Sequence, residues 1–179
     1  MEITSGKIKL LRERTGAGVL DCKRALEETG GDLEKAAELL RQRGLAAAAK
    51  VAGREAREGI VEAYVHHNGD LGVLLELNCE TDFVARTEDF RTLAHDLALQ
   101  VAAIAPRYIA PEDVPAEVIE ERRRAGDELE DFYRQVCLLN QPFIKDQGLS
   151  VADRIRESVA KLGENIVVRR FVRFELGGG

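Results

Sequence analysis

The spacing of apolar residues changes once along this chain, near Gly59. Before Gly59 the apolar residues recur every three or four positions, whereas the segment IVEAYVHHNGDLGVLLELNC (60–79) alternates between apolar and other residues. A period near 3.6 places side chains on one face of a helix, and a period of 2 places them on one face of a strand. We therefore expect an α+β fold, with a helical part first and a sheet after it.

The helical part is expected to be a domain of three short helices over residues 1–45. Ser5 is a candidate cap for the first helix, Asp32 is expected to cap the third, and Gly44 is expected to end it. A domain of this size has a small core, so its stability should be marginal. The alanine-rich and charged residues 46–59 are expected to form a partly helical linker.

The remaining residues, 60–179, are expected to form the α+β core. Asn68 and Gly69 predict a two-residue type I′ turn in which both residues have positive φ. A turn that tight places Tyr64 opposite Val73, and it leaves apolar residues on both faces of the hairpin. Both faces therefore need a cover.

Two amphipathic helices, over residues 90–104 and 150–163, are expected to cover one face of the sheet. Alternation in the last strand predicts one face made of Ile166, Val168, Val172 and Phe174. A second copy of the sheet can cover the other face, so we expect a homodimer through packed sheets. A short charged helical insertion is expected at about 116–137, and LLNQPFIKD (138–146) is expected to lie in a loop.

Charge and composition narrow the classes of partner. The net charge of −6 argues against a nucleic-acid partner. Residues 1–58 hold 12 basic and 10 acidic side chains, so this part is slightly basic and suits an acidic surface. No apolar run is long enough to span a membrane or to act as a signal peptide, so we expect a cytoplasmic protein with no membrane partner.

No catalytic residue and no metal or cofactor site stands out. The three cysteines lie far apart and form no CxxC pair, which argues against a disulfide framework or a zinc site. Cys79 with His66 or His67 is a conceivable nucleophilic pair, but no orienting group or oxyanion donor accompanies it. A small hydrolase therefore stays a weak alternative.

The segment NCETDFVAR (78–86) follows an apolar run that reads as a buried strand. Thr81 or Asp82 can cap a helix there, which leaves Phe83 in its first turn. One interpretation is that Phe83 forms a hydrophobic staple or joins the core. The other is that Phe83 is presented to a partner.

Two ungapped segments resemble the translation elongation factor Ts family: LRERTGAGVLDCKRAL (11–26) and ELNCETDFVAR (76–86). QPFIKD and GENIVVRRFVRFEL (163–176) also resemble it. The resemblance implies a ubiquitin-associated-like three-helix domain, followed by a core of small antiparallel sheet with helices on one face. Longer members carry two copies of the core, so the single copy here implies a dimer. The helical insertion looks short for the family.

The resemblance also implies a function. A member of this family is expected to be a guanine nucleotide exchange factor that releases GDP from elongation factor Tu, without a cofactor and without being an enzyme itself. It implies that the partner-binding residues of the displacement motif are Thr81, Asp82, Phe83 and Val84, with the Asp-Phe pair entering the partner near its magnesium site. In the N-terminal domain the matching candidates are Arg12, Val19, Leu20 and Lys23. A ubiquitin-associated-like adaptor, which would leave Phe83 buried, is the alternative from another class.

Overall fold

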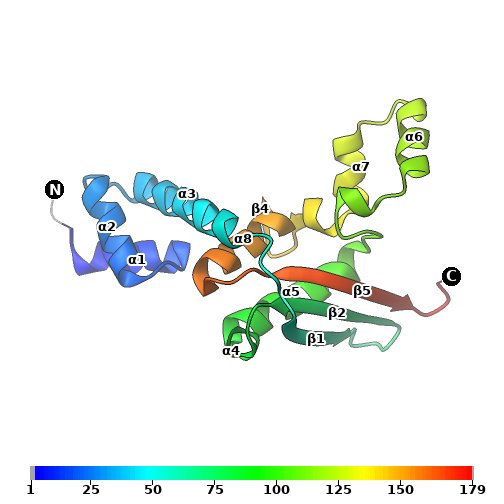
Figure 1. Ribbon diagram of the computed structural model, residues 1–179, viewed down its shortest axis with the longest axis horizontal. Helices are drawn as coiled ribbons and strands as arrows, with labels where there is room; N and C mark the ends of the chain where they lie inside the picture. Colours follow the sequence, from blue (N-terminus) through cyan, green and yellow to red (C-terminus); the bar gives the residue numbers. More distant parts are fainter. Residues whose placement is uncertain (1–2, 179) are drawn as a thin grey trace.

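The structure, a computed structural model, describes residues 3–178; residues 1–2 and 179, at the ends of the expected domains, lie outside it. Figure 1 shows a helical N-terminal unit, a sheet with helices above it, and a helical hairpin that projects from the far end. The elements are α1 (Ser5–Thr15), α2 (Val19–Glu28), α3 (Leu33–Val51), β1 (Glu58–Val65), β2 (Leu71–Cys79), α4 (Asp82–Ala85), α5 (Glu88–Ile104), η1 (Pro111–Asp113), α6 (Ala116–Ala125), α7 (Leu129–Val136), η2 (Leu138–Asn140), β3 (Pro142–Phe143), β4 (Asp146–Ser150), α8 (Val151–Leu162) and β5 (Val167–Glu175). The expected α+β fold is confirmed.

The N-terminal unit consists of α1, α2 and α3, as expected, and its helices are consistent with a ubiquitin-associated-like domain. It has its own core of buried residues: Leu11, Cys22, Ala25, Leu26, Ala36 and Leu40. Asp32 caps α3, and its side chain accepts hydrogen bonds from the amides of residues 34 and 35. The prediction of Ser5 as the first cap was wrong, because Thr4 accepts from the Lys7 amide instead.

Helix α3 continues through Gly44 to Val51, so the predicted helix end at Gly44 was wrong. Gly44 has a packing role, since a Cβ added there would lie 3.2 Å from the Cβ of Ala160 on α8. Ala48 and Val51, further along α3, are buried in the main core. Glycine inside a helix costs about 1 kcal/mol, which the burial of these later residues offsets. The first part of the expected linker is therefore a packed helix.

The sheet has the antiparallel order β1-β2-β5. Tyr64 pairs with Val73 as predicted. The turn between β1 and β2 is not type I′. A type I′ turn needs a positive φ at both Asn68 and Gly69, and only Gly69 has one, 76°. Instead, the Gly69 amide donates to the His66 carbonyl at 2.8 Å and closes a wider loop with the same register.

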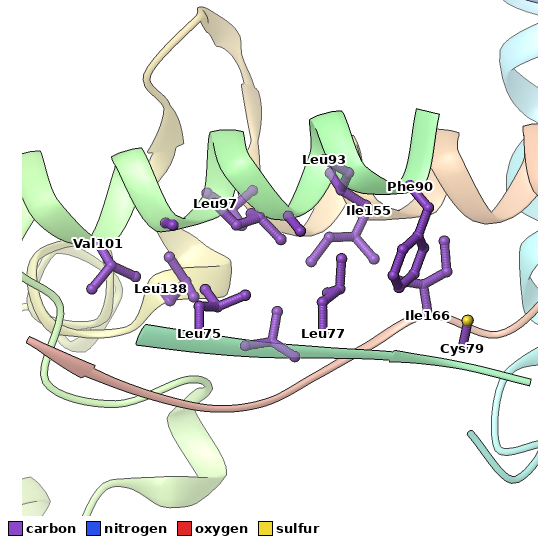
Figure 2. Close-up of a cluster of buried hydrophobic side chains, with 14 of the residues drawn as sticks. Leu75, Leu77, Cys79, Phe90, Leu93, Leu97, Val101, Leu138, Ile155 and Ile166 are labelled. Carbon is purple, nitrogen blue, oxygen red and sulfur yellow. The ribbon is translucent and has the colours of Figure 1, made fainter. Parts of the chain in front are cut away.

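Helices α5 and α8 cover one face of this sheet, since side chains of both helices share a core cluster with those of β2 (Figure 2). In Figure 2, Leu75 and Leu77 of β2 point toward Phe90, Leu93 and Leu97 of α5. These five side chains are completely buried. Each such side chain contributes about 1.5–3 kcal/mol when it leaves water, so this layer makes a large contribution to the stability of the core.

A β-bulge in β5 reverses the alternation of that strand. Glu76 pairs with Arg170 but Leu77 pairs with Val168, so Arg169 has no opposite residue. The prediction that four apolar residues of this strand share a face was therefore wrong. Ile166 and Val168 are buried toward the helices, whereas Val172 and Phe174 are 42% and 68% exposed.

The face of the sheet turned away from α5 and α8 is exposed, and its apolar side chains lie beside the Glu76–Arg170 ion pair. Its exposed apolar side chains, which we call the outer face, are Val61, Val65, Leu74, Val172 and Phe174. Neighbouring strands place these side chains on one side, because Leu74 pairs with both Ala63 and Val172.

The expected charged insertion forms two helices, α6 and α7, which meet at Gly126 and project from the body in Figure 1. A small cluster of Val114, Phe132 and Cys137 holds their base. The segment 138–146 was expected to be a loop, but it contains the short helix η2 and starts a β3–β4 hairpin. Buried Gln100 fixes this hairpin, since its side chain donates to the Pro142 carbonyl and accepts from the Ile144 amide.

Gly59, where the hydrophobic period changes, offers a test of the β1–β2 pairing. It has φ 150°, and a Cβ there would overlap the Leu77 carbonyl oxygen and lie 2.8 Å from the Asn78 Cα. We expect Gly59→Ala to lower the free energy of unfolding by about 3 kcal/mol, measured by urea denaturation. Gly69→Ala is the control, because it adds backbone strain of about 1 kcal/mol in open space. Equal losses in the two variants would contradict the close approach.

Candidate functional site

The predicted displacement motif, residues 81–84, lies where the chain leaves the sheet. Strand β2 ends at Cys79, and one helical turn, α4, follows. Thr81 has an extended backbone, and its hydroxyl accepts a hydrogen bond from the Val84 amide at 3.4 Å. Thr81 is thus the cap of α4, and Asp82 is its first residue.

The single turn of α4 divides its side chains between core and solvent. Ala85 is buried and Val84 packs, half-buried, against the main core. Phe83 points the other way and is 85% exposed. The interpretation of Phe83 as a staple or core aromatic is therefore wrong, and the adaptor alternative loses its expected buried Phe83.

Asp82 lies beside Phe83 on the exposed side. Its carboxylate forms an ion pair with Arg86, at 2.7 Å, one turn along the chain. Both side chains are more than half exposed, so the pair contributes little to stability.

Glu164 anchors the start of this helix through a contact that the sequence analysis did not predict. Its Oε2 accepts from the Glu80 amide at 3.1 Å and from the Thr81 amide at 3.0 Å. Its Oε1 accepts from the Thr81 hydroxyl at 2.6 Å. Glu164 lies in the family-like segment 163–176, just after Gly163 ends α8, but no sequence pattern pairs residues more than 80 positions apart.

The four N-terminal candidates form a second exposed group. Val19 and Leu20, at the start of α2, are 52% and 69% exposed. Arg12 on α1 and Lys23 on α2 are also exposed. Figure 1 shows α4 apart from α1 and α2, so the structure keeps the motif and this group at two separate places.

The suggested Cys79 and histidine pair does not form. Cys79 lies opposite Glu58, the first residue of β1, whereas His66 follows the last residue of β1. The two side chains are therefore separated by the length of the strand, roughly 25 Å. The buried Cys79 thiol donates to the Thr81 carbonyl at 3.1 Å. Burial, with a smaller effect from Glu164, raises the pKa of this thiol from 9.0 to about 11. A protonated thiol is a poor nucleophile at neutral pH.

Among residues 3–178, no group of three or more His, Cys, Asp or Glu side chains is arranged to hold a metal ion. None of the helices in this range has the length and apolar character needed to cross a membrane.

Fold and site together define an α+β protein whose candidate site is an exposed aromatic residue in a short helix, and the cap of this helix is hydrogen-bonded to the core domain. Comparison with known proteins identifies the family. A family profile described as Elongation factor TS matches residues 44–178. Elongation factor Ts of Carboxydothermus hydrogenoformans is 56% identical, over 99% of this chain and 90% of that protein. Those of Moorella thermoacetica and Thermotoga petrophila are 56% and 54% identical, over 99% and 100% of this chain and 97% and 98% of theirs. The chain belongs to the elongation factor Ts family.

Alkylation tests the environment of Cys79. Because the thiolate is the reactive form, a pKa near 11 lowers the reactive fraction at neutral pH about a hundredfold relative to a pKa near 9. We expect iodoacetamide at pH 7.5 to label Cys79 in the folded protein at least about a hundredfold more slowly than in the urea-unfolded chain. Peptide mass spectrometry measures both rates. Similar rates in the two states would show that Cys79 is accessible and reactive.

Proposed function

We propose that this chain is a guanine nucleotide exchange factor that promotes GDP release from elongation factor Tu during translation elongation. Membership of the elongation factor Ts family supports this class of activity. The observation that carries the mechanism is the 85% exposure of Phe83 on a helix whose cap is hydrogen-bonded to the core. The proposed activity uses no cofactor and no chemical step by the factor itself.

In the proposed mechanism, Asp82 and Phe83 enter the GTPase domain of elongation factor Tu beside the magnesium and nucleotide site. Thr81 and Val84 hold the helix turn from which they project, through the cap and the core contact described above. The factor must bind the nucleotide-free or distorted partner more tightly than the GDP-bound form. The coupling is reciprocal, so GDP weakens binding of the factor by the same ratio.

One phenylalanine is not sufficient for fast exchange. Accelerating GDP release by about 10⁴ requires roughly 5.5 kcal/mol of differential stabilisation. Burying Phe83 provides about 1.5–3 kcal/mol of this. We assign the next contribution to the N-terminal group, in which exposed Val19 and Leu20 can pack on a helix of the GTPase domain. Arg12 on α1 and Lys23 on α2 are exposed cations that suit an acidic partner surface.

We further propose that the protein is a homodimer in which the outer faces of two sheets pack together. The five outer-face side chains form one apolar surface across three strands. Isologous dimers bury the same patch on both subunits, and a flat sheet face is suited to this arrangement. The proposed setting is the cytoplasm, with neither nucleic acid nor membrane as a partner.

Stopped-flow release of a fluorescent GDP from elongation factor Tu tests the role of Phe83. We expect Phe83→Ala to lower the acceleration by one to two orders of magnitude, or about 1.4–3 kcal/mol, because a central contact is lost. The fold should be unchanged, since Phe83 contributes little to the core. Ile104→Ala, at an exposed position on α5, is the control and should exchange normally. A fully active Phe83→Ala would refute the wedge.

Light scattering tests the homodimer. Leu74 lies on the central strand and is 47% exposed, so Leu74→Glu should place a charge in the interface without unfolding the subunit. We expect wild-type protein to be dimeric at micromolar concentration and Leu74→Glu to be monomeric. Ile104→Glu, at a residue 46% exposed elsewhere, should stay dimeric. A monomeric wild type would exclude packing through the outer face.

A further inference from the structure

We propose that Glu164 is a positioning residue for nucleotide exchange, because its carboxylate fixes the start of α4 and thereby the direction in which Phe83 projects. The inference rests on the proposed function of Phe83. It concerns a contact between segments that are far apart in the sequence, and neither side chain of the Asp82-Phe83 pair takes part in it.

Helix α4 needs an external anchor. It is a single turn of four residues, and so short a helix is not stable on its own. Phe83 is 85% exposed, so packing does not set its direction. The orientation of Phe83 must therefore come from the backbone on which it stands, through the cap at Thr81 and the core contacts of Val84 and Ala85.

Glu164 supplies the anchor at the cap. Both of its carboxylate oxygens are used, and together they accept three hydrogen bonds, two from the Thr81 amide and hydroxyl and one from the Glu80 amide. Hydrogen bonds to an ionised carboxylate are about twice as strong as those between neutral groups. The Thr81 hydroxyl, which donates to Glu164, also accepts from the Val84 amide. Glu164 thus fixes the same oxygen that caps α4.

The anchor is itself held by a reciprocal contact. The Glu80 carboxylate accepts from the Asn165 amide at 2.7 Å, so residues 80–81 and 164–165 bind each other in both directions. The Asn165 side chain donates to the Arg54 carbonyl at 2.7 Å, and the Arg54 guanidinium lies 3.7 Å from the Glu80 carboxylate. The segment that follows α3 therefore joins the same cluster.

A fixed cap favours exchange for a thermodynamic reason. If the turn were free to move, Phe83 would have to be ordered when the partner binds, and this ordering would weaken the complex. Holding the turn beforehand removes that cost. The side chain of Glu164 then acts on exchange only through the placement of Phe83.

The experiment uses Glu164→Gln, which keeps the shape of the side chain but loses its charge and one acceptor oxygen. Asp153→Asn is the matched control, since Asp153 is a hydrogen-bonded carboxylate at the opposite end of α8, where it bonds Ser150. Each is made alone and combined with Phe83→Ala. Stopped-flow release of fluorescent GDP from elongation factor Tu gives the maximal rate, and urea unfolding checks the fold.

We expect Glu164→Gln to lower the maximal rate about tenfold when Phe83 is present, a factor that corresponds to about 1.4 kcal/mol. In the Phe83→Ala background the same change should lower it less than about twofold, because there is no aromatic side chain left to position. Asp153→Asn should leave the rate within about twofold of wild type in both backgrounds. Amide exchange at Thr81, measured by NMR, should be faster in Glu164→Gln alone.

The outcomes separate this inference from the proposed function. A wild-type protein that does not accelerate GDP release overturns both. If wild type is active and Phe83→Ala is impaired, the proposed function stands. In that case, equal effects of Glu164→Gln in the two backgrounds, or an effect no larger than that of Asp153→Asn, overturn the positioning role alone.

Discussion

The packing of α5 and α8 on one face of the β1-β2-β5 sheet is the constraint on which the other features depend. Leu75 and Leu77 of the central strand point toward these helices and are completely buried (Figure 2). Because β2 is fixed by this layer, the chain leaves the sheet at a defined point, Cys79. Because α8 is fixed by the same layer, its end brings Glu164 to that point.

The motif combines a rigid base with an exposed tip. Val84 and Ala85 belong to the core, and Thr81 is hydrogen-bonded to Glu164, whereas Phe83 has almost no contact with its own chain. An exposed aromatic contributes no free energy of burial to the folded protein, and this free energy becomes available only when the side chain is buried in a complex. The stability of the fold is supplied elsewhere, so this surface is free to match a partner.

The N-terminal unit is joined to the core by a helix rather than by a flexible segment. Helix α3 passes Gly44, which lets it approach Ala160 closely, and then buries Ala48 and Val51 in the main core. A rigid connection reduces the entropy that is lost when two surfaces of one molecule bind the same partner. This arrangement suits a protein that would hold one partner both through Val19 and Leu20 and through Phe83.

The sequence by itself determined the main helices and the central hairpin, its register, the two covering helices and the family, because local periodicity and contiguous motifs carry that information. It also placed Phe83 at a helix start. Only the tertiary structure decided whether Phe83 is buried, since a staple and an exposed aromatic have the same local pattern. The bulge at Arg169, which turns Val172 and Phe174 outward, likewise depends on the pairing of β5 with β2 in the folded chain. The contact of Glu164 with Thr81 depends on the ends of α8 and β2, which meet only in the folded chain. Periodicity reports neighbours along one element, whereas these features are set by packing between elements that are distant in sequence.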